Sequence, residues 1–348
     1  MGKIQSISKW SLENNCWIDS SVDNKHRSFS VASYEPIINN SFRDVNYVII
    51  AYGNRVEDLS KDSYNIRNTK VNMNKIIKYF SRDGMCNYII KYFMLDADAP
   101  IKEEAKMIAH FIDERASLSN TLSINVIGLS KCGAMNIYIP SFFDNPDSFK
   151  CTNIYNVATP YNGTISASPL IFYPKIKELV ISKFGDNKFS NTVYENLINY
   201  YESISSNSHM DYDIARINGI TDDMLDRYDR SFIENIFSSE NINALKKINN
   251  FYNYTTHIDE GVLSKAVQNG DFASIGLCLM DKWFFEEPSD GLVQTSDQYL
   301  IECCLNTKSV DLISTHNIAH SKEYYKVLSK ITENAYKAND KKRRRYLY

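Results

Sequence analysis

The sequence predicts an α/β fold in which a mostly parallel sheet carries helices on both faces and a helical cap is inserted into the chain. Short β-branched runs alternate with amphipathic segments through the first half, and this order builds parallel sheets. Long Asn- and Tyr-rich helical segments interrupt the alternation after residue 166, and apolar runs return after residue 271. The chain has 348 residues, 43% of them hydrophobic, which is enough to bury the core of such a fold.

The first elements follow a polar segment. Residues 1–43 are rich in Ser and Asn and show no sustained periodicity, so we expect an irregular arm with at most one short strand. The β-branched run over 45–51 predicts a buried strand, and residues 87–95 repeat its pattern. Helices are expected over 71–80 and, with apolar residues on one face, over 101–116.

Strand and helix alternate further along the chain. Residues 123–128 predict a third strand, 132–138 the helix that follows it and 154–158 a fourth strand. Near the end of the chain, residues 309–313 predict another strand and 322–337 a closing helix. This βαβα order favours a parallel sheet with helices on both faces.

The polar block between these regions is expected to form a helical cap over the sheet. Its helices are predicted over 192–204, 222–237 and 242–251. The chain is therefore divided into an irregular arm (1–43), the first part of the core (44–165), the cap (166–271), the second part of the core (272–338) and a basic tail (339–348).

The composition excludes several classes of protein. Thirty-nine Lys and Arg stand against 42 Asp and Glu, so the charge that nucleic-acid binding requires is lacking and no nucleic-acid partner is expected. The seven cysteines are an odd number and form no C-x-x-C pair, which argues against a disulfide framework or a zinc site. No other ligand cluster is found, and we expect neither a metal nor a cofactor.

The third predicted strand runs directly into a candidate nucleophile. Gly128, Ser130 and Gly133 lie in the segment Gly-Leu-Ser-Lys-Cys-Gly between that strand and a helix, which is the context of a nucleophile elbow. An elbow requires small residues two positions before and two after its serine, because strand and helix approach closely there. Gly128 meets the first requirement, and Cys132 stands where Gly is usual. The alternative interpretation is a tight turn without catalytic role.

Three further segments occur in a consistent order. Tyr52-Gly53-Asn54 follows the first buried strand, and Thr159-Pro160-Tyr161-Asn162-Gly163 follows the fourth. Ser289-Asp290-Gly291-Leu292-Val293 contains an Asp-Gly turn, and Thr315-His316 precedes the closing helix. With the elbow, these segments resemble the lipases and esterases of the α/β-hydrolase family, over residues 44–165 and 272–335.

The resemblance implies a catalytic triad of Ser130, Asp290 and His316, in the chain order of this family. A serine hydroxyl is a weak nucleophile, so an imidazole must take its proton and a carboxylate must orient that imidazole. The implied oxyanion hole is formed by backbone N–H groups of Lys131 and of Gly53 or Asn54. Tyr52 stands where the family has His, and a backbone donor tolerates that change.

Two of these assignments have alternatives. His320 lies four residues after His316 and is the alternative catalytic histidine, or else a cap of the closing helix. Asp290 would also be explained by an Asx-type turn alone, which Asp-Gly often makes. The other histidines have no identifiable partner in the sequence; they are His26, His110, His209 and His257.

We therefore expect a serine hydrolase that cleaves a carboxylic ester through an acyl-enzyme. The Thr159-Pro160 segment and the large cap favour an ester of a lipid or phospholipid, as in a lipase or a phospholipase A. One alternative is an acyltransferase or thioesterase that uses the same triad. The other is a non-catalytic binding or scaffold protein on the same fold, favoured by Tyr52 and Cys132.

The expected location is the cytoplasm, and peripheral membrane contact stays open. There is no apolar run of about 18 residues, as a spanning helix requires, and no secretory signal. Met1 to Ser6 fits M-G-x-x-x-[ST], the pattern for myristoylation of Gly2. One such chain anchors only marginally, so a palmitoylated Cys16 or the basic run Lys341–Arg345 would supply the second signal. The alternatives are a chance match and a solvated, frayed tail.

Overall fold

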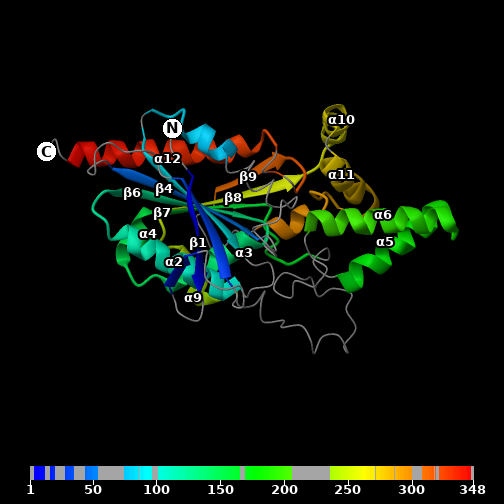
Figure 1. The fold of residues 1–348 in the computed structure, drawn as a ribbon, viewed down its shortest axis with the longest axis horizontal. Helices are drawn as coiled ribbons and strands as arrows, with labels where there is room; N and C mark the ends of the chain where they lie inside the picture. The colour runs from blue at the N-terminus through cyan, green and yellow to red at the C-terminus, as the bar shows by residue number, and fades with distance from the viewer. Residues whose placement is uncertain are drawn as a thin grey trace.

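A single sheet organises the molecule. The computed structural model describes residues 4–11, 16–19, 28–34, 44–53, 74–84, 86–95, 101–164, 169–205, 236–270, 272–285, 287–299, 308–316, 318 and 321–345. Within these residues the sheet has nine strands in the order β2-β1-β3-β5-β4-β6-β7-β8-β9 (Figure 1). The strands from β6 to β9 follow the order of the sequence. Two neighbouring pairs are exchanged relative to the sequence: β5 with β4, and β2 with β1 at the N-terminal edge.

Six strands of the sheet are parallel, which confirms the predicted fold class. Each is short and rich in β-branched or aromatic residues. The last of them lies at the edge of the sheet, and most of its residues are exposed. The six are β4 (Val45–Gly53), β5 (Tyr88–Leu95), β6 (Thr121–Leu129), β7 (Thr152–Val157), β8 (Asn250–His257) and β9 (Lys308–Ile313).

The N-terminal segment is more regular than its sequence predicted. Its described residues form three strands, β1 (Ile4–Ser11), β2 (Cys16–Asp19) and β3 (Ser28–Tyr34). They pair antiparallel with one another, and β3 pairs antiparallel with β5. The expectation of an irregular arm was wrong because strands at an antiparallel edge need no continuous apolar run, and this segment has none.

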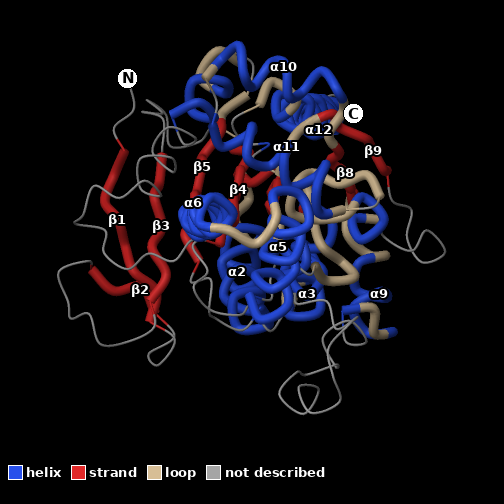
Figure 2. The backbone as a smooth tube through the Cα atoms, turned by 90° about the vertical axis from the view of Figure 1, so that its right-hand side faces the viewer, coloured by secondary structure: helices blue, strands red, loops and turns tan. Residues whose placement is uncertain are grey.

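Helices cover both faces of the sheet. On one face lie α2 (Ile101–Ala116), α3 (Lys131–Tyr138), η1 (Ile139–Phe142), α4 (Pro146–Cys151) and α9 (Ser239–Leu245) (Figures 1 and 2). On the other face lie α12 (Tyr324–Arg345) and a helix over 74–80. Alternate side chains of β4 serve the two layers: Tyr47 and Ile49 pack with α2, whereas Val48 and Ile50 pack with α12.

Part of the predicted cap is a helical hairpin. Helix α5 (Pro169–Phe184) packs against α6 (Lys188–Ser205), and the pair extends away from the sheet (Figure 1). Ile176, Val180 and Met280 form a small core that joins α5 to α11 (Phe272–Phe284), which follows α10 (Glu260–Asn269). The helix predicted over 222–237 lies outside the described residues, apart from its last two.

The assigned cap also contains a strand of the core, which corrects the predicted boundaries. The expected helix over 242–251 ends at Leu245, and β8 begins at Asn250 between β7 and β9. The segment was misassigned because its Asn and Tyr residues resemble a solvated surface. Tyr252 and Asn253 are buried instead, because other elements satisfy their polar groups: Asn253 accepts from the Tyr161 hydroxyl at 3.0 Å, and the Tyr252 hydroxyl accepts from Asn334 of α12 at 3.1 Å.

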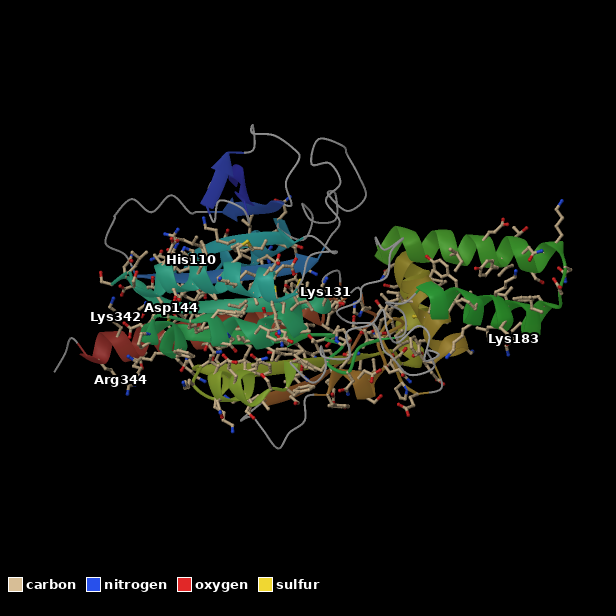
Figure 3. The ribbon with its side chains drawn as sticks, turned by 90° about the horizontal axis from the view of Figure 1, so that it is seen from below. His110, Lys131, Asp144, Lys183, Lys342 and Arg344 are labelled. Atoms are coloured by element: carbon tan, nitrogen blue, oxygen red, sulfur yellow. The ribbon has the colours of Figure 1, made fainter. Side chains whose placement is uncertain are left out.

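The C-terminal basic run belongs to a helix, not to a separate tail. Helix α12 continues to Arg345, where Lys342 bonds to the Asp44 carboxylate and Arg344 pairs with Asp340 at 2.9 Å. Figure 3 shows Lys342 and Arg344 at one end of the molecule, Lys183 of the hairpin at the other end and Lys131 between them. Gly2 lies outside the described residues, and Cys16 lies in β2. Across the described helices, none is long and apolar enough to cross a membrane.

Candidate active site

Ser130 lies between β6 and α3 in a strained backbone conformation. Its φ of 53° and ψ of −126° fall outside the regions that non-glycine residues usually occupy. The Ser130 amide donates to Val157 O of β7 at 2.9 Å, and Ser130 O accepts from Gly133 N at 2.9 Å. These bonds fix a sharp turn from strand into helix, which is the geometry that an elbow serine requires.

Two glycines permit this turn. A Cβ on Gly128 would lie 2.5 Å from Cys132 O, so β6 and α3 approach each other too closely for any side chain there. On the helix side, a Cβ on Gly133 would lie 1.8 Å from Thr159 Oγ1. The helix residue that has no room for a side chain is therefore Gly133, three residues after Ser130. Cys132, two residues after Ser130, is fully buried in the helix.

Asp290 is fully buried and both of its carboxylate oxygens are bonded. Oδ1 accepts from Leu292 N at 3.0 Å and Val293 N at 2.9 Å, which makes an Asx-type turn. Oδ2 accepts from Thr256 Oγ1 at 2.6 Å and Gln298 Nε2 at 3.2 Å. One oxygen thus builds the turn while the other is available to a further partner.

That partner is His316. Its Nδ1 lies 2.9 Å from Asp290 Oδ2, and its amide donates to Asp290 O at 2.8 Å, so backbone and ring are held by the same residue. The His316 side chain is 15% exposed. With Nδ1 directed to the carboxylate, the other ring nitrogen, Nε2, is the one left for proton transfer.

Ser130, Asp290 and His316 share one edge of the sheet. Ser130 follows β6, His316 follows β9, and Asp290 bonds to Thr256 near the end of β8; because these strands are parallel, their carboxyl ends meet at that edge. The edge faces the α5–α6 hairpin, as the position of Lys131 in Figure 3 shows. Among the described residues, Asp290 and His316 are in contact, while no hydrogen bond joins Ser130 Oγ to the ring.

The backbone donors expected for an oxyanion also flank Ser130. Lys131 opens α3, and the first N–H groups of a helix have no acceptor within it. Ala51 of β4 pairs with Gly128, so Gly53, two residues further on, ends its strand beside Ser130. Asn54 lies outside the described residues.

Neither of the other two described histidines bonds to Ser130 or Asp290. His110 is on α2 with its Nε2 3.4 Å from Glu114, and His257 ends β8. His320 lies outside the described residues, as do His26 and His209. Within the described part of the chain, no group of His, Cys, Asp and Glu could hold a metal ion.

Three residues of the site were missed in the sequence. Thr256 and Gln298 bond directly to Asp290, and Asp281 of α11 accepts from Ser289 Oγ at 2.7 Å and from Ser289 N at 3.0 Å. Asp281 thereby anchors the turn that carries Asp290. No motif marks these residues, because they reach the site from separate elements.

Ser130 lies at positive φ between a parallel strand and a helix, and a bonded Asp–His pair follows along the chain at the same edge of the sheet. This arrangement is typical of the α/β-hydrolase fold. The chain has the α/β-hydrolase fold.

Solved structures with similar folds include known hydrolases. A mature lipase of Bacillus licheniformis is 9% identical with a TM-score of 0.44, and the match covers 86% of this chain and 97% of that one. An esterase of Pyrococcus furiosus is 10% identical with a TM-score of 0.43, over 97% and 91% of the two chains. No family model and no curated protein matches the sequence.

The strain at Ser130 predicts an effect on stability. Glycine adopts positive φ without a Cβ penalty, so Ser130→Gly should raise the free energy of unfolding by about 1 kcal/mol. Ser141→Gly, in η1, is the control and should lower it, because glycine weakens a regular helical turn and the Ser141 hydroxyl no longer donates to Asn241 Oδ1. Urea denaturation followed by circular dichroism measures both. Equal losses in the two variants would contradict a strained elbow.

The Asp281 carboxyl predicts a pH effect. Burial, with the Asp290 charge adding to it, raises the pKa of Asp281 above its ordinary 3.8. The folded state therefore binds this proton more tightly, and the resulting stability is complete below pH 3.8 and lost as pH rises through the raised pKa. Asp281→Asn keeps the acceptor oxygen without the titration. Its stability relative to the wild type should increase between about pH 4 and pH 7 in denaturant titrations; a constant difference would contradict this assignment.

Proposed function

We propose that this protein is a serine hydrolase of carboxylic esters, with Ser130 as nucleophile, His316 as general base and Asp290 as its orienting acid. The observation that carries the proposal is the 2.9 Å contact of His316 Nδ1 with the buried Asp290 carboxylate, at the sheet edge where Ser130 occupies a strained turn. A buried Asp–His pair beside a strained serine is the combination that activates a hydroxyl.

The reaction follows from this arrangement. His316 Nε2 takes the proton of Ser130 Oγ, and Oγ bonds to the ester carbonyl carbon. The N–H groups of Lys131 and of Gly53 or Asn54 stabilise the oxyanion. As the carbonyl reforms, the alkoxide leaves and receives the proton from the imidazolium. Water then attacks the acyl-enzyme carbonyl carbon and gives a proton to His316. As the C–Oγ bond breaks, His316 returns this proton to Ser130 Oγ, which releases the acid and free Ser130.

Asp290 serves this cycle through its fixed position. Its bond to Nδ1 holds the ring in the tautomer that leaves Nε2 unprotonated, and its charge stabilises the imidazolium. Thr256 and Gln298 hold the same oxygen that contacts His316, at 2.6 and 3.2 Å. The carboxylate is therefore in place before a substrate arrives, which lowers the reorganisation that the reaction requires.

We extend the proposal to esters with long acyl chains, such as those of lipids and phospholipids. The supporting observation is apolar surface on the cap: Phe184 and Phe189, at the turn between α5 and α6, are 41% and 62% exposed. Their rings contact each other at 5.6 Å between centroids. Figure 3 shows Lys183, the neighbour of Phe184, at the tip of the hairpin away from Lys131. Exposed aromatic residues of this kind favour contact with an apolar partner such as a lipid surface.

The proposal predicts that Ser130→Ala loses ester hydrolysis with the fold retained. The rate with p-nitrophenyl esters should fall at least about a thousandfold, because no other group replaces the nucleophile. Ser141→Ala, which removes a hydroxyl from η1 instead, should keep the wild-type rate. Release of p-nitrophenol measures the rate, and circular dichroism checks the fold.

Two results would contradict parts of this account. A folded wild-type protein without hydrolysis, or a Ser130→Ala variant as active as the wild type, would exclude the proposed nucleophile. Faster turnover of p-nitrophenyl acetate than of the decanoate would exclude the preference for long acyl chains and leave the ester hydrolase in place.

A further inference from the structure

A continuous series of buried hydrogen bonds joins the helix that follows Ser130 to the carboxylate of Asp290. It passes through four side chains that the reaction does not use. All four are fully buried; they are Asn156, Tyr161, Asn253 and Gln298.

The first half of the series starts on α3. Asn156, on β7, donates through Nδ2 to Gly133 O at 2.7 Å and to the Tyr161 hydroxyl at 2.9 Å. Gly133 N is itself bonded to Ser130 O. The Tyr161 hydroxyl is therefore linked through a single side chain to the first turn of the helix that carries the elbow.

The second half ends on Asp290. The Tyr161 hydroxyl donates to Asn253 Oδ1 at 3.0 Å, and Asn253 Nδ2 donates to Gln298 O at 2.9 Å. Gln298 Nε2 then donates to Asp290 Oδ2 at 3.2 Å, the oxygen that contacts His316. The series thus connects the helix that follows Ser130 to the Asp290–His316 pair.

Every link is costly to break because water cannot replace it. A buried polar group left without its partner costs the full free energy of removing that group from water. Neighbouring hydrogen bonds in a network also strengthen one another. Burial also raises the pKa of Tyr161, so its hydroxyl keeps the proton that it donates to Asn253. The series therefore keeps Gly133 and the Asp290 carboxylate at a fixed distance from each other.

The turn that carries Tyr161 touches both ends independently. It begins at Ala158, whose φ of 53° matches that of Ser130 on the neighbouring strand. Thr159 abuts Gly133, and Asn162 N donates to Asp297 O, next to Gln298, at 3.4 Å. Tyr161 lies between these contacts, at the one point of the series that contributes a hydroxyl.

We propose that Tyr161 is a positioning residue of the ester hydrolase, whose hydroxyl fixes the distance between the Ser130 elbow and the Asp290–His316 pair. The inference rests on the proposed function. Tyr161 touches no reacting atom, and it acts by holding Asn156 and Asn253 in register. Without the hydroxyl, Asn156 and Asn253 lose their shared partner, and Ser130 is held less firmly toward His316.

Tyr161→Phe tests the proposal, with Tyr155→Phe as its matched control. Tyr155 is also fully buried, and its hydroxyl also accepts one amide and donates to one Asn, from Asn334 at 2.7 Å and to Asn125 at 3.2 Å. It lies in the layer beside α12, away from the series. Both variants should lose similar thermal stability. Only Tyr161→Phe should lose kcat for p-nitrophenyl esters, about tenfold or more, with KM unchanged.

A spectroscopic readout separates this result from loss of the proposed function. The downfield ¹H resonance of the His316 Nδ1 proton, assigned by its absence in His316→Gln, should shift or broaden in Tyr161→Phe and stay in place in Tyr155→Phe. Equal kcat values and unchanged resonances in the two variants would overturn the positioning role. An inactive wild type would overturn the proposed function.

A second variant covers the case in which Tyr161→Phe does not fold. Asn253→Asp keeps the acceptor for Tyr161 and removes the donor to Gln298 O. It should lose kcat in the same direction, and a folded variant with wild-type kcat would overturn the proposal.

Discussion

The buried Asp290 carboxylate needs hydrogen-bond donors, and several elements of the C-terminal half of the chain supply them. A fully buried carboxylate must be compensated by donors, since an unpaired buried charge costs several kcal/mol. The donors come from its own turn, from Thr256 on β8, from Gln298 on η3 (Thr295–Gln298) and from His316 after β9. Bringing these elements to one carboxylate also creates the acid–histidine pair on which the proposed chemistry depends.

On the other side of the site, the strained backbone of Ser130 must be held in place by its neighbours. Ser130 keeps an unfavourable φ because its amide is bonded to Val157 and because Gly128 and Gly133 let strand, helix and the Thr159 turn approach closely. The parallel sheet then brings Ser130 to the edge where Asp290 and His316 meet. Position in the sheet, rather than proximity in the sequence, assembles the candidate site.

The sequence predicts those helices and strands whose local residue pattern matches the structure that they form in the fold. Residues 101–116 form the expected helix, and the short motifs around Ser130, Asp290 and His316 reach one edge because strand order is encoded by the βαβ alternation. The sequence does not predict β8, because the buried Tyr252 and Asn253 look solvent-facing until the fold brings polar partners to them. Gln298 and Tyr161 were missed as supports of Asp290 for the same reason: their role consists of contacts across elements, which no local pattern encodes.

The proposed chemistry depends on Ser130 being an activated nucleophile. Mass spectrometry of peptides from protein treated with a fluorophosphonate, which bonds covalently to activated serines, measures this directly. We expect one adduct, on the peptide that contains Ser130, and its loss when His316 is replaced by Gln. An adduct on another serine, or an unmodified Ser130 in folded protein that hydrolyses esters, would contradict this expectation.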